Sequence, residues 1–104
     1  MSDLGALHTV NKSPFSSRTL WDCLSRLNNG ALLLLEDGVY AALAAAPSAA
    51  ALASLAQAGR LYVLAPDLTA RGLADAPLLD GILLVDYGGF VDLTVRHHPV
   101  QSWF

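Results

Sequence analysis

Short apolar runs alternate along the chain with stretches in which apolar residues recur every three or four positions. A continuous apolar run is typical of a strand that is covered on both faces of a parallel sheet. The helical period is clearest where Leu20, Leu24 and Leu27 fall on one face. These patterns predict strands at residues 4–10, 31–35, 60–65, 82–85 and 101–104. They predict helices at residues 16–27, 39–46, 48–58 and 67–73, and a weaker helix or turn at residues 89–96.

This alternation of strands and helices predicts an α/β fold. We expect a small three-layer sandwich around a mainly parallel sheet of four to five strands. No linker, charged tail or internal repeat divides residues 1–104, so a single domain is expected. Pro47 and Gly59 stand where the helix at 48–58 would begin and end.

The composition leans to the apolar side of a globular domain, with 54% apolar and 14% charged residues. Such a surplus indicates apolar surface that is left for a partner. No apolar run approaches the ~20 residues that cross a bilayer, so no membrane association is expected. Met1, Ser2 and Asp3 lack the basic start of a secretion signal. A single cysteine without a signal indicates a reducing, cytoplasmic setting.

The charge pattern argues against direct nucleic-acid binding. The formal net charge is −3, Lys12 is the only lysine, and the arginines are scattered along the chain. Nucleic-acid binding draws much of its affinity from clustered cations that displace phosphate counterions. If the protein serves an RNA pathway, we expect a partner to hold the RNA.

Acidic residues follow three of the predicted strands: Glu36-Asp37, Asp67 and Asp86. The carboxyl ends of parallel strands share one edge of a sheet, where ligands bind in open α/β folds. A carboxylate cluster for metal binding or acid–base chemistry is one interpretation. We favour the other, in which each aspartate caps the helix that follows it by accepting free N–H groups.

The three histidines do not predict a metal site. His8 lies in the first predicted strand, and His97 and His98 are adjacent, so their side chains are expected to point apart. No His or Cys set has the spacing of metal ligands. We therefore expect no metal, and a core or interface position for His8.

Neither a phosphate loop nor a hydrolase nucleophile is indicated. The pair Gly88-Gly89 belongs to no phosphate-binding pattern and is expected to permit a tight turn from strand to helix. Ser13 precedes Pro14 in a predicted turn and lacks a nucleophile motif. No cofactor is expected.

Cys23 is the only cysteine and flanks the apolar stripe that contains Leu20 and Leu27. A free cysteine in this position is either a small packing residue or a sulfur-handling group, and the spacing leaves both open. Arg26 would lower the pKa of the thiol, and Asp22 would oppose that effect. The sequence therefore does not encode a strongly activated thiol.

Five blocks of sequence resemble the TusB/DsrH family, in family order and over nearly the whole chain. They are LHTVNKSPF at residues 7–15, LEDGVYAA at 35–42, VLAPDL at 63–68 with Arg71-Gly72, VDYGGFV at 85–91, and Trp103-Phe104. Together these blocks are specific for the family, and their amino-acid sequences are closer to those of the DsrH-like members.

The resemblance implies a small parallel α/β sandwich of the DsrE/F/H type. It also implies a subunit of a cytoplasmic sulfur-relay complex, a heterohexamer with TusC/DsrF-like and TusD/DsrE-like subunits. Such complexes pass persulfide sulfur to a downstream acceptor protein. They serve either 2-thiolation of the wobble uridine in tRNA or dissimilatory sulfur oxidation.

In this family the cysteine, where present, follows the SPF block, and Cys23 fits that place. The resemblance implies an auxiliary persulfide site at Cys23, with the main carrier in the TusD/DsrE-type partner. Three interpretations stay open: an accessory subunit, a sulfurtransferase that acts alone, and a structural subunit without a sulfur-carrying cysteine. The candidate interface anchors are the aromatic residues Tyr40, Phe90, Trp103 and Phe104. Homo-oligomers of the isolated chain also stay open.

Overall fold

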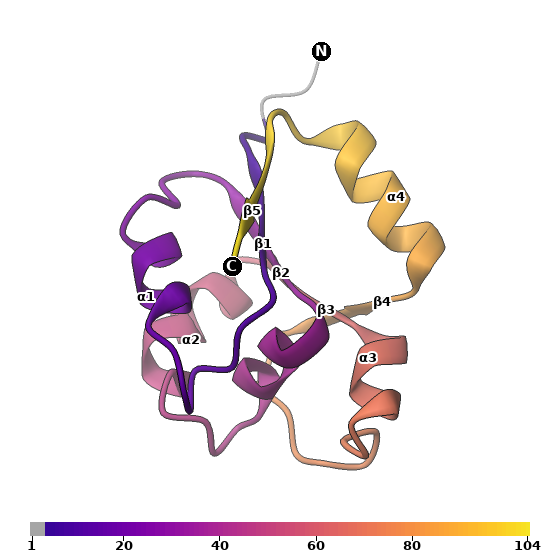
Figure 1. Cartoon of the computed structure of the whole chain (residues 1–104). Helices are drawn as coiled ribbons and strands as arrows, with labels where there is room; N and C mark the ends of the chain where they lie inside the picture. The colour runs from indigo at the N-terminus through magenta and orange to yellow at the C-terminus, as the bar shows by residue number, and fades with distance from the viewer. Residues whose placement is uncertain (1–3) are drawn as a thin grey trace.

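A single sheet of five parallel strands forms the centre of the computed structural model, which describes residues 4–104 (Figure 1). Residues 1–3, which bear on the secretion signal, lie outside the described residues. The strand order is β4-β3-β2-β1-β5, and every neighbouring pair is parallel. The strands are β1 (Leu7–Val10), β2 (Ala31–Leu34), β3 (Leu61–Leu64), β4 (Leu83–Val85) and β5 (Val100–Trp103). The prediction of a mainly parallel sheet of four to five strands is confirmed.

The helices lie on both faces of this sheet and complete the three predicted layers. They are α1 (Thr19–Leu24), the 3-10 helix η1 (Glu36–Ala42), α2 (Ala49–Gln57), α3 (Ala65–Ala70) and α4 (Tyr87–Arg96). The chain steps outward from β1 to β4, and connections of one hand then place their helices on one face. The return from β4 to β5 runs in the opposite direction and places α4 on the other face (Figure 1).

The core is divided by the sheet into two unequal parts. The larger part lies under α1, η1 and α2 and includes Leu20, Cys23 and Leu52. The smaller part consists of Leu7, Ala31, Leu33 and Leu93, beneath α4. All residues of β1 and β2 are buried, which explains why their apolar runs are continuous. Because α4 is the one helix that residues 4–104 place on this face, part of the face stays uncovered at the β5 edge.

One predicted helix is of a different kind. Residues 39–46 were expected to form an α-helix, but the chain forms a 3-10 helix at Glu36–Ala42. Leu43 then makes an antiparallel bridge to Leu78. The amide of Ala44 donates to the carbonyl of Pro77, at 3.0 Å. These long-range hydrogen bonds hold Leu43 in an extended conformation, and the residues after it form turns, so tertiary pairing overrides helix propensity.

Other elements differ from the predictions mainly in their ends. The first strand begins at Leu7 rather than at residue 4. The first helix is shorter than predicted and spans Thr19–Leu24. At its start the amide of Thr19 donates a hydrogen bond to Oγ of Ser17. Gly59 ends α2 as predicted, with a φ of +72°. Among residues 4–104, no helix combines the length and the apolar character needed to cross a bilayer.

The prediction of a tight turn from strand to helix at Gly88-Gly89 is confirmed, because β4 ends at Val85 and α4 begins at Tyr87. Both residues lie in the first turn of α4, which is a regular helix of 10 residues. A Cβ atom on Gly89 would stand 3.0 Å from Cβ of Val85, so this glycine allows the helix to start close to the end of β4.

Candidate functional site

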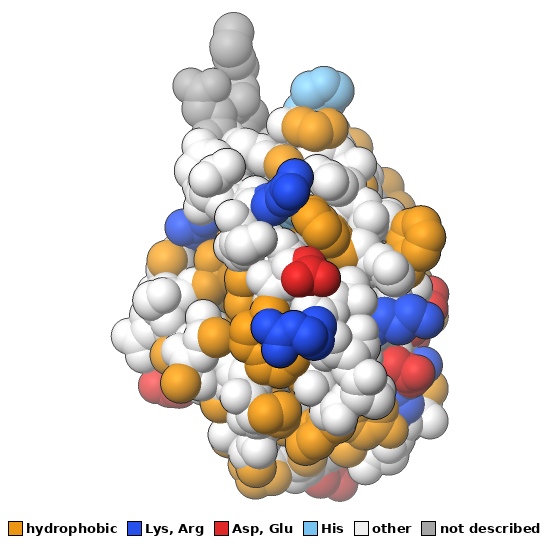
Figure 2. All heavy atoms as spheres, turned by 60° about the vertical axis from the view of Figure 1, so that its left-hand side comes forward, with side chains coloured by type: hydrophobic (Ala, Val, Ile, Leu, Met, Phe, Trp, Pro, Cys, Tyr) orange, Lys and Arg blue, Asp and Glu red, His pale blue; other side chains and the backbone are white. Residues whose placement is uncertain are grey.

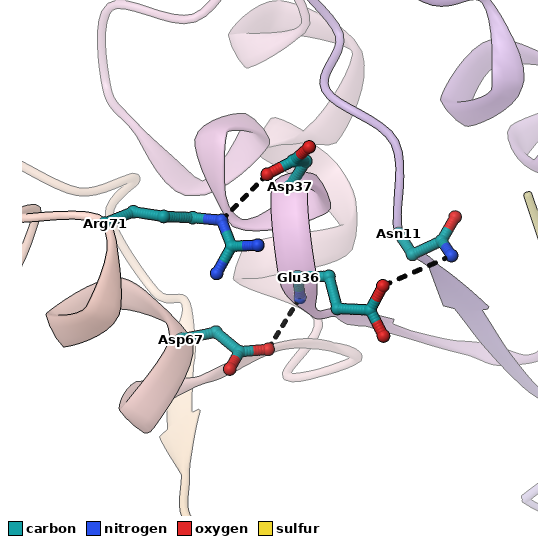
Figure 3. Close-up of polar contacts among 5 residues, drawn as sticks. All are labelled: Asn11, Glu36, Asp37, Asp67 and Arg71. Atoms are coloured by element: carbon teal, nitrogen blue, oxygen red, sulfur yellow. Dashed lines mark hydrogen bonds and ion pairs between the residues drawn. The ribbon is translucent and has the colours of Figure 1, made fainter.

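Polar side chains from three segments meet at the carboxyl edge of the sheet (Figure 3). Asn11 follows β1, Glu36 and Asp37 follow β2, and Asp67 and Arg71 come from α3 and its end. Oδ2 of Asp67 accepts the backbone N–H of Glu36 at 2.6 Å. Nε of Arg71 donates to Oδ1 of Asp37 at 2.9 Å, and Nδ2 of Asn11 donates to Oε1 of Glu36 at 3.5 Å. The predicted edge therefore carries a connected polar network.

The capping prediction is confirmed for Asp86 alone. Its Oδ1 accepts the N–H of Gly89 at 2.8 Å at the start of α4. Asp67 lies inside the first turn of α3 and caps the neighbouring η1 through Glu36. Asp37 lies within η1 and pairs with Arg71. The prediction is wrong for Asp37 and Asp67 because the parallel sheet brings the ends of β2 and β3 together.

Glu36 adopts a left-handed backbone with a φ of +51°. A side chain in this region costs of order 1–3 kcal/mol, which the surrounding contacts must offset. The hydrogen bond from its N–H to Asp67 is one such contact. The conformation directs the Glu36 carboxylate toward Asn11 and Asp37 toward Arg71 (Figure 3). Strained residues of this kind cluster at functional sites.

The network has an excess of negative charge. The carboxylates of Glu36, Asp37 and Asp67 stand against the single guanidinium of Arg71, which leaves a net charge of −2. The hydrogen bond to Asp37 is the main cause that raises the pKa of Arg71, so this group stays charged. Among residues 4–104, no three His, Cys, Asp or Glu side chains are grouped in a way that would hold a metal ion.

A hollow of about 410 Å³ opens beside this network, on the sheet face that α4 leaves uncovered. Thr9 and Ser102 form its floor as register partners on β1 and β5. Neither hydroxyl has a hydrogen-bond partner within residues 4–104. The lining also includes Asn11, Leu35, Glu36, Phe90, Val100, Trp103 and Phe104.

The histidines lie as predicted. His8 is buried, and its Nδ1 accepts a hydrogen bond from Nε1 of Trp103 at 3.0 Å. Burial lowers the pKa of His8. His97 is buried with Nδ1 2.8 Å from the carbonyl of Leu93, whereas His98 is exposed. The predicted divergence of the two adjacent histidines is confirmed.

The thiol of Cys23 is sealed in the larger part of the core. Its exposed fraction is 0%, and Leu20 and Leu27 belong to the same buried cluster. Burial raises the pKa of Cys23 to about 12. Because the thiolate is the nucleophile, the folded chain presents Cys23 in an unreactive, inaccessible form. An auxiliary persulfide site at this residue stays a prediction.

A family model described as "DsrH like protein" matches residues 12–100. This chain belongs to the TusB/DsrH family. It is 43% identical to Protein TusB of Pectobacterium parmentieri over 98 residues, which cover 93% of this chain and 99% of that protein. Protein TusB of Escherichia coli (strain K12) is 41% identical over 100 residues, and that of Photorhabdus laumondii is 36% identical over 99 residues, with the same coverage.

The fold of this TusB/DsrH chain is shared with a solved structure described as the crystal structure of ychN protein from E. coli. The two superpose with a TM-score of 0.81 over 98% of this chain and 99% of the other. At 19% sequence identity, this likeness shows the fold alone.

The candidate interface anchors differ in their exposure. Tyr40, Phe90 and Trp103 are half-buried, and Phe90 packs on the smaller core while Trp103 packs on the larger. Phe104 is 81% exposed. Of the four, Phe104 is thus the open aromatic side chain.

The sequence reasoning missed a second apolar stripe, on the outer face of α4. It consists of Tyr87, Val91 and Val95, which are 60%, 61% and 77% exposed; we call it the α4 stripe. Leu83 and Leu84 of the edge strand β4 are also exposed. The spacing i, i+4, i+8 was the available signal. On the face that carries α1, Figure 2 shows apolar side chains in small groups separated by polar and charged ones.

Proposed function

We propose that this chain is a subunit of a cytoplasmic sulfur-relay complex, assembled with TusC/DsrF-like and TusD/DsrE-like subunits. The observation that carries the proposal is the 43% identity to Protein TusB of Pectobacterium parmentieri over nearly the full length of both chains. The unpartnered apolar surface supports it, because an exposed stripe of this kind is typical of a protein–protein interface.

Within that complex the chain acts as an accessory subunit rather than as an enzyme by itself. The one thiol of the chain is closed off and has a raised pKa of about 12, so it offers no nucleophile in the folded state. The buried position of Cys23 favours the structural alternative, in which the partner subunits carry the sulfur. A persulfide on Cys23 would require α1 to open on assembly.

The α4 stripe is the main assembly surface in this proposal. Stable interfaces bury roughly 800 Å² on each partner, around a core that is poor in charge and rich in aromatic and aliphatic side chains. Tyr87, Val91 and Val95 provide such a core, and Leu83 extends it onto β4. The interface then uses the outer side of the helix that shields the smaller part of the core.

The named relatives favour tRNA thiolation over dissimilatory sulfur oxidation as the pathway, because each is a Protein TusB. The chain contributes no nucleic-acid surface to this pathway. Its arginines are dispersed and its net charge is −3, so another component of the relay holds the tRNA.

The proposal is tested by producing the chain together with the TusC-like and TusD-like proteins of the same genome. Native mass spectrometry is expected to show one hetero-oligomer that contains all three chains. Val91→Asp on the α4 stripe should abolish assembly, whereas Ala53→Asp on the exposed side of α2 should preserve it. A chain that never associates with these partners would overturn the proposal.

The pathway is tested in an E. coli strain that lacks its own TusB. Expression of this chain with its partners should restore 2-thiouridine in tRNA, measured by liquid chromatography and mass spectrometry. Cys23→Ala is expected to restore it as well, because the buried thiol is packing in the favoured alternative. Loss of thiolation in that variant, with the complex intact, would instead support the auxiliary persulfide site.

A further inference from the structure

The hollow beside β5 combines an apolar wall with a polar floor. Leu35, Phe90 and Val100 line it together with Phe104, which follows β5. Trp103 also borders the hollow, but its side chain packs against His8 on the other face of the sheet. The hydroxyls of Thr9 and Ser102 lie next to each other on the floor, because these residues are register partners. An occupant therefore needs an apolar or flat body and a hydrogen-bonding end.

The polar groups of the hollow are suited to a ligand group that donates hydrogen bonds and carries a positive charge. Glu36 brings an exposed carboxylate, and no lysine or arginine lines the hollow. Oδ1 of Asn11 is buried and has no hydrogen-bond partner within residues 4–104. Asp37 and Asp67 lie behind Glu36 and, with Arg71, leave this edge with a net charge of −2 (Figure 3). A cationic donor would complement both the unused acceptors and the charge.

Arginine fits this combination better than other donors. Its planar guanidinium binds a carboxylate through two parallel hydrogen bonds and stacks on aromatic rings. Its aliphatic stem would lie along the apolar wall. A lysine ammonium would meet the charge of Glu36 but would gain less from the aromatic rings of Phe90 and Phe104.

The β5 edge shows how such a side chain would arrive. The carbonyls of Pro99 and Trp103 accept hydrogen bonds from the amides of Leu7, which begins β1, and of Asn11, which follows it. In a parallel pair the intervening residues turn their backbone groups the other way, so those of Val100 and Ser102 face the open edge of the sheet. β5 carries no charged residue that would discourage pairing. Extended segments add to such edges and place alternate side chains over the neighbouring face.

We propose that the hollow receives an arginine side chain from an extended segment of a partner subunit that pairs with β5. This inference rests on the proposed function, since the partner subunits supply the segment. The hollow would thus be a second contact surface for the partner, besides the α4 stripe. Unlike the stripe, it would select a positively charged side chain.

The test uses the folded chain and two blocked peptides, Thr-Val-Arg-Val-Thr and the same peptide with citrulline in place of arginine. Citrulline keeps the shape of the side chain and removes its charge. In two-dimensional amide NMR titrations, the arginine peptide should shift the signals of Thr9, Ser102 and Phe104. The citrulline peptide should bind about threefold to fivefold more weakly, the effect of a partly exposed ion pair.

Matched variants assign the preference to the hollow. Glu36→Gln should reduce the ratio of the two affinities to about one, since only the charge is lost. Asp80→Asn removes an exposed carboxylate that does not line the hollow, and should leave the ratio unchanged. Equal binding of both peptides by the unaltered chain, or shifts confined to other residues, would overturn the inference. The proposed function would then still be decided separately, by the co-assembly experiment with the partner subunits.

Discussion

The indole Nε1–H of Trp103 donates a hydrogen bond to Nδ1 of His8 at 3.0 Å. The two ring centroids lie 6.2 Å apart, with the ring planes inclined by 33°. Because Nδ1 accepts this bond, the imidazole is neutral and carries its proton on Nε2. The contact fastens β5 to β1 on the face opposite α4, at a point where both side chains border the larger part of the core.

We expect this contact to make the chain less stable in weak acid. Burial lowers the pKa of His8 from 6.5 in the folded state, so below about pH 6.5 the unfolded chain binds a proton that the folded chain does not. The free energy of unfolding should fall as the pH falls from that value, and level off below the folded pKa. Urea unfolding at about pH 7.5 and about pH 5 measures the difference.

His8→Asn is the matched control for this pH dependence. Its side-chain oxygen replaces Nδ1 as an acceptor for Trp103 but does not titrate. The variant should be less stable overall, because the ring leaves a cavity, yet it should lose less stability between the two pH values. A pH dependence equal to that of the unaltered chain would contradict the assignment to His8.

Cys23 should be inert toward thiol reagents in the folded chain. Its side chain is sealed and its pKa is raised to about 12, so both access and ionisation are suppressed. Labelling with iodoacetamide at about pH 8 should proceed only as fast as the chain opens, and should accelerate in urea. Rapid labelling without denaturant would show that the thiol is reachable.

Substitutions of Cys23 test the same burial thermodynamically. Cys23→Ser places a hydroxyl without a partner in the core and should cost about 1–3 kcal/mol of stability. Cys23→Ala removes the sulfur without adding a polar group and should cost less. A serine variant as stable as the alanine variant would argue against a dry site.

Gly38 should be the least replaceable glycine of the chain. A Cβ atom there would overlap the carbonyl oxygen and carbon of Val10, both backbone atoms that cannot swing aside. Gly38→Ala should therefore cost about 1–3 kcal/mol or more, the range for forced overpacking. At Gly88 a Cβ atom would meet only Oδ1 of Asp86, at 3.4 Å, so Gly88→Ala should be nearly neutral or stabilising. Thermal unfolding of the two variants compares them directly.

Asp86→Ala should loosen α4 through the loss of its cap. The substitution leaves the N–H of Gly89 without its acceptor and should cost about 1 kcal/mol. Asp86→Asn retains an acceptor oxygen and should cost only a few tenths of a kcal/mol of stability, since Asn caps nearly as well as Asp. Amide hydrogen exchange should be faster over Tyr87–Arg96 in the alanine variant and unaffected in β1 and β2. Uniform acceleration across the chain would contradict a local role.

The strands were predictable from sequence because β1 and β2 are buried on both faces. Such strands need continuous apolar runs, and their signal does not depend on any particular neighbour. The cap at Asp86 was predictable for a similar reason, because donor and acceptor lie within one turn of sequence. Local rules are sufficient where the partner is close along the chain.

The partners of Asp37 and Asp67 were not predictable in the same way. Arg71 and Glu36 reach them across the ends of adjacent strands, and only the sheet order decides that these ends meet. The 3-10 helix at Glu36–Ala42 likewise depends on Leu78, which lies far along the chain. The depth of Cys23 had a local signal, its place beside the leucine stripe, but the packing of α1 on β1 and β5 decides that it is sealed.

The position of β5 has a consequence for how the protein is made. β5 pairs with β1, so Leu7 has no partner at this edge until Val100 has left the ribosome. Until then β1 offers a bare edge that other nascent chains can join, and contacts over such sequence distances form late. Co-translational encounter with a partner, or protection by a chaperone, would therefore matter most at this strand.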